Sequence, residues 1–393
     1  MLSEPMADSV SRPPEIRALM GARALPPLVL VLFHFCEQSG YFGLRILDAP
    51  IAKGYLWVEF FFALSGFILI YVYGGRAAKL WRPGGYLSFL ATRLARLYPL
   101  HIATIVILAL ILWLSRAVCG PFGLISIFDQ PYHPVLTGQT LIGNLFLVQA
   151  WNLYPSLSWN APAWFVSIEF LLCILFPLFA TLARGNARRG VLIAASGIAG
   201  LIALLTFSRH GLDLTFHNGI YRGIADFAVG VGFAVIFRNL RYTQTPMATG
   251  LIWFGQIALL AVLFFGIYQG GLPRTQKDLL IAVPIMALVL LLAFDRGPLA
   301  RLMQTRTLMA LGEWSYAIYL VQYPLLQLLR TIRQFYPHQM LPLGEWGWTV
   351  HRVEAIVLLA ACIAAGAALT WLVEQPANRW LRRRIATAFP RTA

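Results

Sequence analysis

Long apolar runs separated by short polar connections make up most of this sequence. A window of about nineteen residues, the length that crosses the hydrocarbon core of a bilayer as an α-helix, locates the candidate spans. They lie near 24–43, 55–74, 98–115, 162–183, 191–207, 219–237, 248–268, 279–294, 312–329 and 353–373. The apolar segment 140–151 is too short to cross and is expected to be interfacial or re-entrant. The pattern predicts an all-α, polytopic transmembrane helical bundle of about ten spans.

The overall composition is that of an integral membrane protein. Of the 393 residues, 59% are hydrophobic and 12% are charged, and the mean hydropathy is +0.69, values outside the range of soluble domains. The four cysteines show no CxxC spacing and are interpreted as small buried apolar residues. One membrane domain is expected to fill 1–393, with an N-terminal segment 1–22, spans between 23 and 373, and a basic tail 375–393.

The distribution of basic residues predicts the orientation of the spans, because cytoplasmic loops hold an excess of Lys and Arg. The alternate connections that include both ends of the chain hold 21 of the 31 basic residues, the other connections hold 9, and Arg222 lies within a span. Both termini are therefore predicted to be cytoplasmic. The net charge of +15 is spread over short loops, so no nucleic-acid partner is expected.

Ionisable side chains inside the spans mark candidate functional positions. Each costs about 2.5–3.5 kcal/mol at a helix centre, so each needs a partner or a task. The spans contain His34, Glu37, Glu59, Glu169, Arg222 and Asp226. Helical spacing places His34 with Glu37, and Arg222 with Asp226, on shared helix faces. The second pair is expected to be a neutralised ion pair, and Glu59 is expected at an interface or a helix N-terminus.

One histidine and three arginines carry the candidate chemistry. In RALPPLVLVLFHF (23–35), helix rise places His34 roughly 16 Å beyond Arg23, about halfway into a bilayer core. A histidine with a nearby carboxylate suits general-base catalysis, although a hydrogen-bonded structural role is the alternative. Arg93 and Arg96 lie at the same cytoplasmic level as Arg23. Guanidinium groups bind phosphates bidentately, so these arginines suit an anionic ligand that carries phosphates. The alternative interpretations are that they set the topology or contact lipid headgroups.

Seven segments carry a resemblance to a known family. They are RALPPLVLVLFHF (23–35), VEFFFALSGF (58–67), RLARLYP (93–99), PAWFVSIEF (162–170), YRGIADFAVGVGFA (221–234), LGEWSYAIYLVQYP (311–324) and VEQPANRWLRRR (373–384). In content and order they resemble the motifs of the membrane acyltransferase-3 family, which O-acylates surface polysaccharides, lipopolysaccharide and some small molecules. Two segments depart from the family pattern. Gln322 stands where many members have a histidine, and Phe165 and Val166 replace a Ser-Leu pair.

The resemblance implies an O-acyltransferase that uses cytosolic acyl-coenzyme A, most often acetyl-coenzyme A, as co-substrate, with no tightly bound cofactor and no metal. Arg23, Arg93 and Arg96 would bind the phosphates of the acyl donor. His34 would act as general base or carry the acyl group, and a carboxylate, Glu169 in preference to Glu37, would orient the imidazole. The residues expected to support the site are Glu37, Glu59, Ser65, Trp164, Ser167, Arg222 and Asp226.

The expected acceptor is a carbohydrate or lipid-linked glycan, such as an exopolysaccharide or O-antigen sugar, and the expected location is a bacterial plasma membrane, with membrane lipids as the other partners. No oligomeric state is predicted. Two other classes remain open. A transporter or flippase would use His34 and the intramembrane carboxylates as a proton relay, although no pair of broken helices in repeated halves is evident. A sensor with a decayed site would not be expected to retain His34 together with the arginines.

Overall fold

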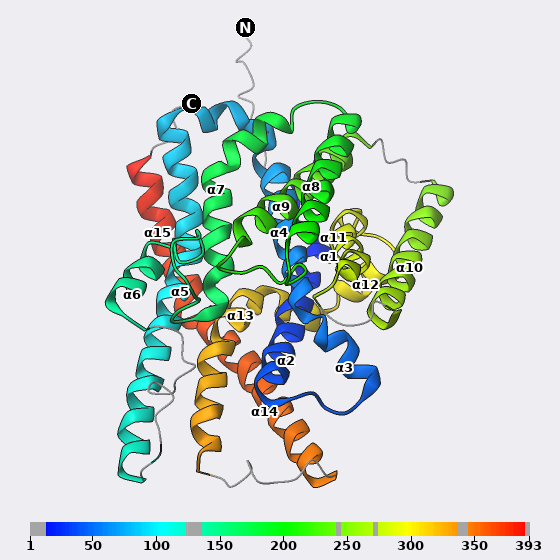
Figure 1. Ribbon diagram of the computed structural model, residues 1–393. Helices are drawn as coiled ribbons and strands as arrows, with labels where there is room; N and C mark the ends of the chain where they lie inside the picture. Colours follow the sequence, from blue (N-terminus) through cyan, green and yellow to red (C-terminus); the bar gives the residue numbers. More distant parts are fainter. Residues whose placement is uncertain are drawn as a thin grey trace, which may run out of the picture.

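The computed structural model describes residues 13–122, 124, 136–240, 245–269, 274–335 and 345–389, without the side chains of 45, 76 and 345–348. Within these ranges all regular secondary structure is helical, and the helices form one bundle (Figure 1). The predicted all-α architecture is confirmed.

The helices follow the apolar runs of the sequence. The first half of the chain contains α1 (Arg17–Ala22), α2 (Leu25–Ser39), α3 (Arg45–Ala52), α4 (Val58–Tyr73), α5 (Pro83–Cys119), α6 (Gly138–Leu145) and α7 (Trp164–Leu182). The second half contains α8 (Ala187–Phe207), α9 (Gly219–Asn239), α10 (Pro246–Gln269), α11 (Leu279–Ala293), α12 (Pro298–Met303), α13 (Arg306–Arg333), α14 (Glu345–Leu369) and α15 (Gln375–Ala388). A π-helical turn, Thr370–Glu374, joins α14 to α15.

Nine helical segments in the described part of the chain are long and apolar enough to cross a membrane. The tenth predicted span, 312–329, lies within α13, which has 28 residues but is less apolar than the other nine segments. The short apolar segment 140–151 overlaps the eight-residue helix α6, which is too short to cross a bilayer. The orientation of the bundle in the membrane, and with it the cytoplasmic position of both termini, stays a prediction.

A break in the first span determines where Arg23 lies. Pro26 and Pro27 occupy the first turn of α2, where the missing N–H is tolerated, so α2 begins there as a new helix. The preceding helix α1 ends at Ala22, and Arg23 is its C-terminal cap. The first span thus extends from Arg17 to Ser39, beginning earlier than predicted, with Arg23 at the junction of its two helices.

Helices α4 and α9 pack with their backbones in contact. A Cβ atom at Gly66 would lie 2.3 Å from the carbonyl oxygen of Phe227, and one at Gly230 would lie 1.9 Å from that of Ala63. Small residues permit such close approach between membrane helices, whose association relies on van der Waals packing. The contact brings the intramembrane charges of α4 and α9 within reach of each other.

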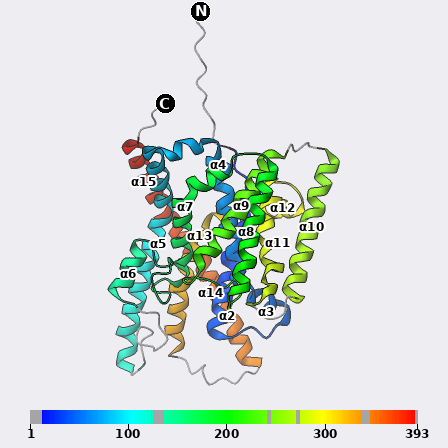
Figure 2. The same cartoon turned by 45° about the horizontal axis from the view of Figure 1, so that its top comes forward.

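The long helices run between the two ends of the bundle. In Figure 1, α4 ends and α5 begins at the top, whereas α5 and α13 end and α14 begins at the bottom. Figure 2 shows the same arrangement with the top turned forward. Helix α13 packs against α1, α2, α5 and α14, so its side chains reach several elements that carry candidate site residues.

Candidate functional site

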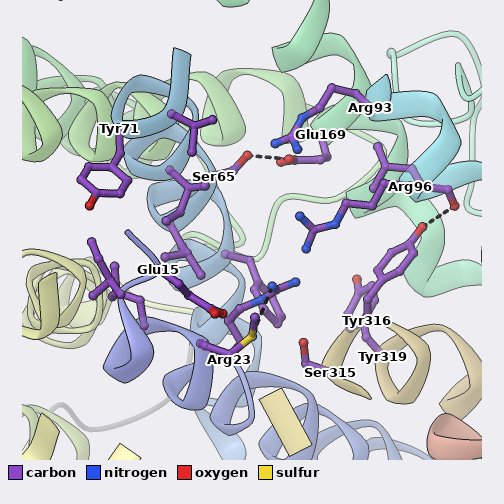
Figure 3. A pocket seen from close by; sticks show the side chains of 18 of the residues that line it. Glu15, Arg23, Ser65, Tyr71, Arg93, Arg96, Glu169, Ser315, Tyr316 and Tyr319 are labelled. Carbon is purple, nitrogen blue, oxygen red and sulfur yellow. Dashed lines mark hydrogen bonds between the residues drawn. The ribbon is translucent and has the colours of Figure 1, made fainter. Parts of the chain in front are cut away.

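The three candidate arginines meet around one cavity of about 500 Å³, which we call the arginine cavity. Arg23 enters it from the junction of α1 and α2, and Arg93 and Arg96 enter it from α5 (Figure 3). Ser65 on α4 and Glu169 on α7 line the same space. The structure therefore brings together residues that are far apart in the sequence and that were predicted to act on one ligand.

Glu169 is held by Ser65 inside this cavity. The Ser65 hydroxyl donates a hydrogen bond of 2.5 Å to Oε1 of Glu169, and Oε2 of Glu169 is buried without a hydrogen-bond partner in the described residues. Glu169 interacts electrostatically with all three arginines, but in that part of the chain no carboxylate lies within 4.0 Å of their guanidinium nitrogens. The positive charges of the three guanidinium groups are thus not neutralised by an ion pair within this part of the chain, although Arg23 donates to Sδ of Met20 at 3.9 Å.

Two tyrosines of α13 form a wall of the arginine cavity. The hydroxyl of Tyr316 donates to the carbonyl oxygen of Leu97 at 2.7 Å, and that of Tyr319 donates to the carbonyl oxygen of Pro162 at 2.6 Å. The ring of Tyr319 also meets that of Phe165 edge-on, with their centroids 5.7 Å apart. These contacts fix both rings in position.

His34 lines a second cavity of about 320 Å³, which we call the histidine cavity. Its lining includes His34 and Glu37 of α2, Trp164 of α7, and Tyr319 and Tyr323 of α13. Tyr319 therefore faces both cavities. The predicted shared face of His34 and Glu37 is confirmed, because both side chains line this space.

The residue that contacts the imidazole is not the one that sequence analysis preferred. Nδ1 of His34 lies 3.2 Å from Oε1 of Gln322, and Nε2 of Gln322 donates to the carbonyl oxygen of Tyr319 at 2.9 Å. Glu169 lines the arginine cavity, so its predicted contact with His34 is wrong. Gln322 lies one turn after Tyr319 on α13. Because α13 packs against α2, the side chain of Gln322 reaches His34.

Glu37 is held by an arginine at the rim of the histidine cavity. Arg274 binds Oε1 of Glu37 at 2.6 Å and Oδ2 of Asp213 at 2.8 Å. Partial burial lowers the pKa of Arg274, but the hydrogen bonds and charges of Asp213 and Glu37 outweigh it and raise the pKa above its ordinary value. Glu37 therefore pairs with Arg274, and its carboxylate links α2 to the chain that precedes α11.

The expected pairing of Arg222 with Asp226 is wrong. Arg222 instead donates two hydrogen bonds to Glu59 on α4, at 2.6 and 3.2 Å, and one to the carbonyl oxygen of Tyr55 at 2.8 Å. Both oxygens of Asp226 are buried without a hydrogen-bond partner among the described residues. A guanidinium group at the end of a long side chain reaches the neighbouring helix, because α4 and α9 pack so closely.

Glu59 is in the first turn of α4, as its position predicted, and it is fully buried inside the bundle. Trp164 packs beside this pair, with the Arg222 guanidinium carbon 5.7 Å from its ring centroid. Arg222 also lines the histidine cavity. Of the two partners in the ion pair, Arg222 is thus part of the wall of that cavity.

Ser167 lines neither cavity. Its hydroxyl donates to the carbonyl oxygen of Leu147 at 2.7 Å and accepts from the amide of Ala150 at 3.2 Å. It therefore holds the loop after α6 against α7. These hydrogen bonds are structural, and the expected supporting role of Ser167 at the site stays a prediction.

The sequence did not indicate that Tyr316 and Tyr319 line the cavities, or that Gln322, noted only as a departure from the family pattern, contacts His34. Their spacing of three residues places them on one face of a helix, which is the signal that indicates a shared surface. Arg274 gave no such signal, because it lies in a loop. Among the described residues, no group of three His, Cys, Asp or Glu side chains is arranged to hold a metal ion.

Comparisons with known proteins place this geometry in context. A family model described as an acyltransferase domain matches residues 16–374. Acyltransferase MdmB of Streptomyces mycarofaciens is 27% identical over 94% of this chain and 94% of its own length. Protein 2 in picA locus of Rhizobium radiobacter is 31% identical over 51% of this chain and 100% of its own. Putative peptidoglycan O-acetyltransferase YrhL of Bacillus subtilis is 23% identical over 81% of this chain and 50% of its own. No solved structure matches.

Proposed function

Because the chain belongs to the acyltransferase-3 family of membrane acyltransferases, we propose that it transfers an acetyl group from acetyl-coenzyme A to a hydroxyl of a carbohydrate. One observation carries this proposal. Three arginines line one cavity, a histidine lines another, and Tyr319 borders both. A reaction between a phosphate-bearing acyl donor and a hydroxyl acceptor needs two such spaces that meet.

The arginine cavity binds the acyl donor in this proposal. Arg23, Arg93 and Arg96 hold the phosphates of coenzyme A through charge-assisted hydrogen bonds, for which the planar guanidinium group is suited. Glu169, held by Ser65, attracts the three arginines and helps to keep them in position. The pantetheine arm then extends along the apolar lining toward Tyr319, which brings the thioester to the border with the histidine cavity.

The histidine cavity binds the acceptor. His34 acts as general base: it takes the proton of the acceptor hydroxyl as that oxygen forms a bond to the thioester carbonyl carbon. The bond from this carbon to sulfur then breaks, and the imidazolium returns the proton to the departing thiolate. The products are an O-acetyl ester and free coenzyme A. A base is required, because a hydroxyl is a weak nucleophile at neutral pH.

Two features support a carbohydrate as acceptor. Aromatic side chains of Tyr55, Trp164 and Tyr323 line the histidine cavity, and such rings offer apolar faces to a sugar. One relative is named as a putative peptidoglycan O-acetyltransferase, and its name gives a glycan-containing polymer as the acceptor. The volume of about 320 Å³ is at the lower end for ligand sites, so it fits one sugar unit at a time.

The orientation of the bundle determines which side of the membrane each cavity faces. The basic loops favour an orientation in which the arginine cavity opens toward the cytosol, where acyl-coenzyme A is made. We place the protein in the bacterial plasma membrane, with the glycan acceptor approaching the histidine cavity from the outer side. The acetyl group is thereby passed across the bundle.

The proposal is tested by measuring the transfer of a labelled acetyl group to a glycan. Membranes that contain the protein are incubated with [¹⁴C]acetyl-coenzyme A and isolated glycans, and the glycan fraction is analysed by counting and by mass spectrometry. We expect a mass gain of one acetyl group in the glycan, absent from membranes without the protein. A transporter or flippase would move the acceptor without adding this mass, and that outcome would refute the proposal.

A further inference from the structure

The hydrogen bonds around Gln322 determine which nitrogen of His34 carries the proton. The side-chain amide of Gln322 lies 2.9 Å from the carbonyl oxygen of Tyr319, which only accepts, so the amide nitrogen faces that carbonyl. The amide oxygen Oε1 then faces the imidazole at 3.2 Å, and it too only accepts. Nδ1 of His34 is therefore the donor.

This assignment leaves Nε2 of His34 with its lone pair. Nδ1 has its hydrogen bond to Gln322, whereas Nε2 has no hydrogen-bond partner among the residues that the structure describes. His34 itself lines the histidine cavity, so this nitrogen is available to a molecule bound there. A neutral imidazole with a free Nε2 is the form that accepts a proton from a hydroxyl.

We propose that Gln322 is a positioning residue that holds His34 in the Nδ1–H tautomer, an inference that rests on the proposed function. In a serine-hydrolase triad this task falls to a carboxylate, which also stabilises the imidazolium. Gln322 is 2% exposed, and a neutral amide at this depth orients the ring without burying a charge. The site thus uses a general base whose orienting partner adds no negative charge.

The same amide connects the base to the border between the cavities. Gln322 is tied to the backbone of Tyr319, whose side chain faces both cavities. The position of the imidazole is therefore fixed relative to the point at which the acyl donor and the acceptor meet. Glu37, the nearest carboxylate along α2, is bound to Arg274 and is not available for this task.

Three variants test the proposal. Gln322→Met keeps the length of the side chain but removes the acceptor, so we expect kcat to fall at least tenfold with an unchanged KM for acetyl-coenzyme A. Gln322→Glu keeps an acceptor and adds a charge, so we expect activity to be retained and the acid limb of the pH–rate profile to move to higher pH. Gln327→Met is the matched control, because Gln327 is another buried glutamine of α13 that lines neither cavity.

A measurement independent of activity reports the tautomer. In ¹⁵N-histidine-labelled protein, the His34 signals are identified by their loss in His34→Gln. We expect the Nδ1–H form in the wild type and a mixture of tautomers in Gln322→Met. An Nε2–H form in the wild type, or full activity of Gln322→Met, would overturn the proposal even if acetyl transfer is confirmed. Failure of acetyl transfer in the wild type, with the Nδ1–H tautomer present, would overturn the proposed function instead.

Discussion

Arg222 on α9 donates two hydrogen bonds to Glu59 on α4, at 2.6 and 3.2 Å, and both side chains are fully buried. The pair joins two helices whose backbones touch at Gly66 and Gly230. Both carboxylate oxygens of Glu59 are bonded to the guanidinium group, so Glu59 neutralises Arg222 and joins α4 to α9.

Loss of Glu59 is expected to destabilise the protein. Glu59→Gln leaves the Arg222 guanidinium buried without its counter-charge, and breaking such a pair costs roughly 3–5 kcal/mol. Thermal unfolding in detergent should show a clearly lowered midpoint. Asp226→Asn is the control, because neither oxygen of Asp226 has a hydrogen-bond partner in the described part of the chain. An equal loss of stability in both variants would contradict the assignment.

His34→Ala is expected to abolish acetyl transfer without affecting assembly. Removing a general base lowers the rate of such a step by about 10²- to 10⁴-fold. The measurement is label transfer at matched protein levels, together with binding of labelled coenzyme A. We expect binding to persist, because the arginines line a different cavity. Turnover at the wild-type rate would remove His34 from the mechanism.

Arg93→Ala and Arg96→Ala are each expected to raise the KM for acetyl-coenzyme A about tenfold or more, because a charge-assisted hydrogen bond contributes about 1.5–3 kcal/mol. Acetyl-pantetheine, which lacks the nucleotide and its phosphates, provides the control substrate. Its KM should be the same in wild type and variants. If both substrates are affected alike, the arginines act through the structure of the cavity and not through the phosphates.

Tyr319 is expected to keep the acyl donor from reacting with water. Its ring borders both cavities, and its hydroxyl is tied to the carbonyl oxygen of Pro162. Tyr319→Ala should increase the release of coenzyme A in the absence of acceptor, measured with a thiol reagent, and Tyr319→Phe should do so less. Tyr316→Phe is the control, since Tyr316 lines the arginine cavity alone. Unchanged release in Tyr319→Ala would show that the ring is no barrier.

The features that the sequence predicted depend mostly on interactions within one segment of the chain. Insertion of an apolar run into a bilayer depends on the residues of that run, so the spans were located from hydropathy. The proline pair marks the start of α2 for a similar reason, because the missing N–H acts within one turn. The candidate arginines and His34 were also found from the sequence, since a buried charge is costly wherever it lies.

Only the tertiary structure decided which side chains meet. The pattern paired Arg222 with Asp226 and preferred Glu169 as the partner of His34, whereas the fold pairs Arg222 with Glu59 and His34 with Gln322. Helical spacing describes one helix at a time. Contacts between helices depend on the rotation and offset of each helix against its neighbours, which is set here by backbone contacts such as that of α4 with α9.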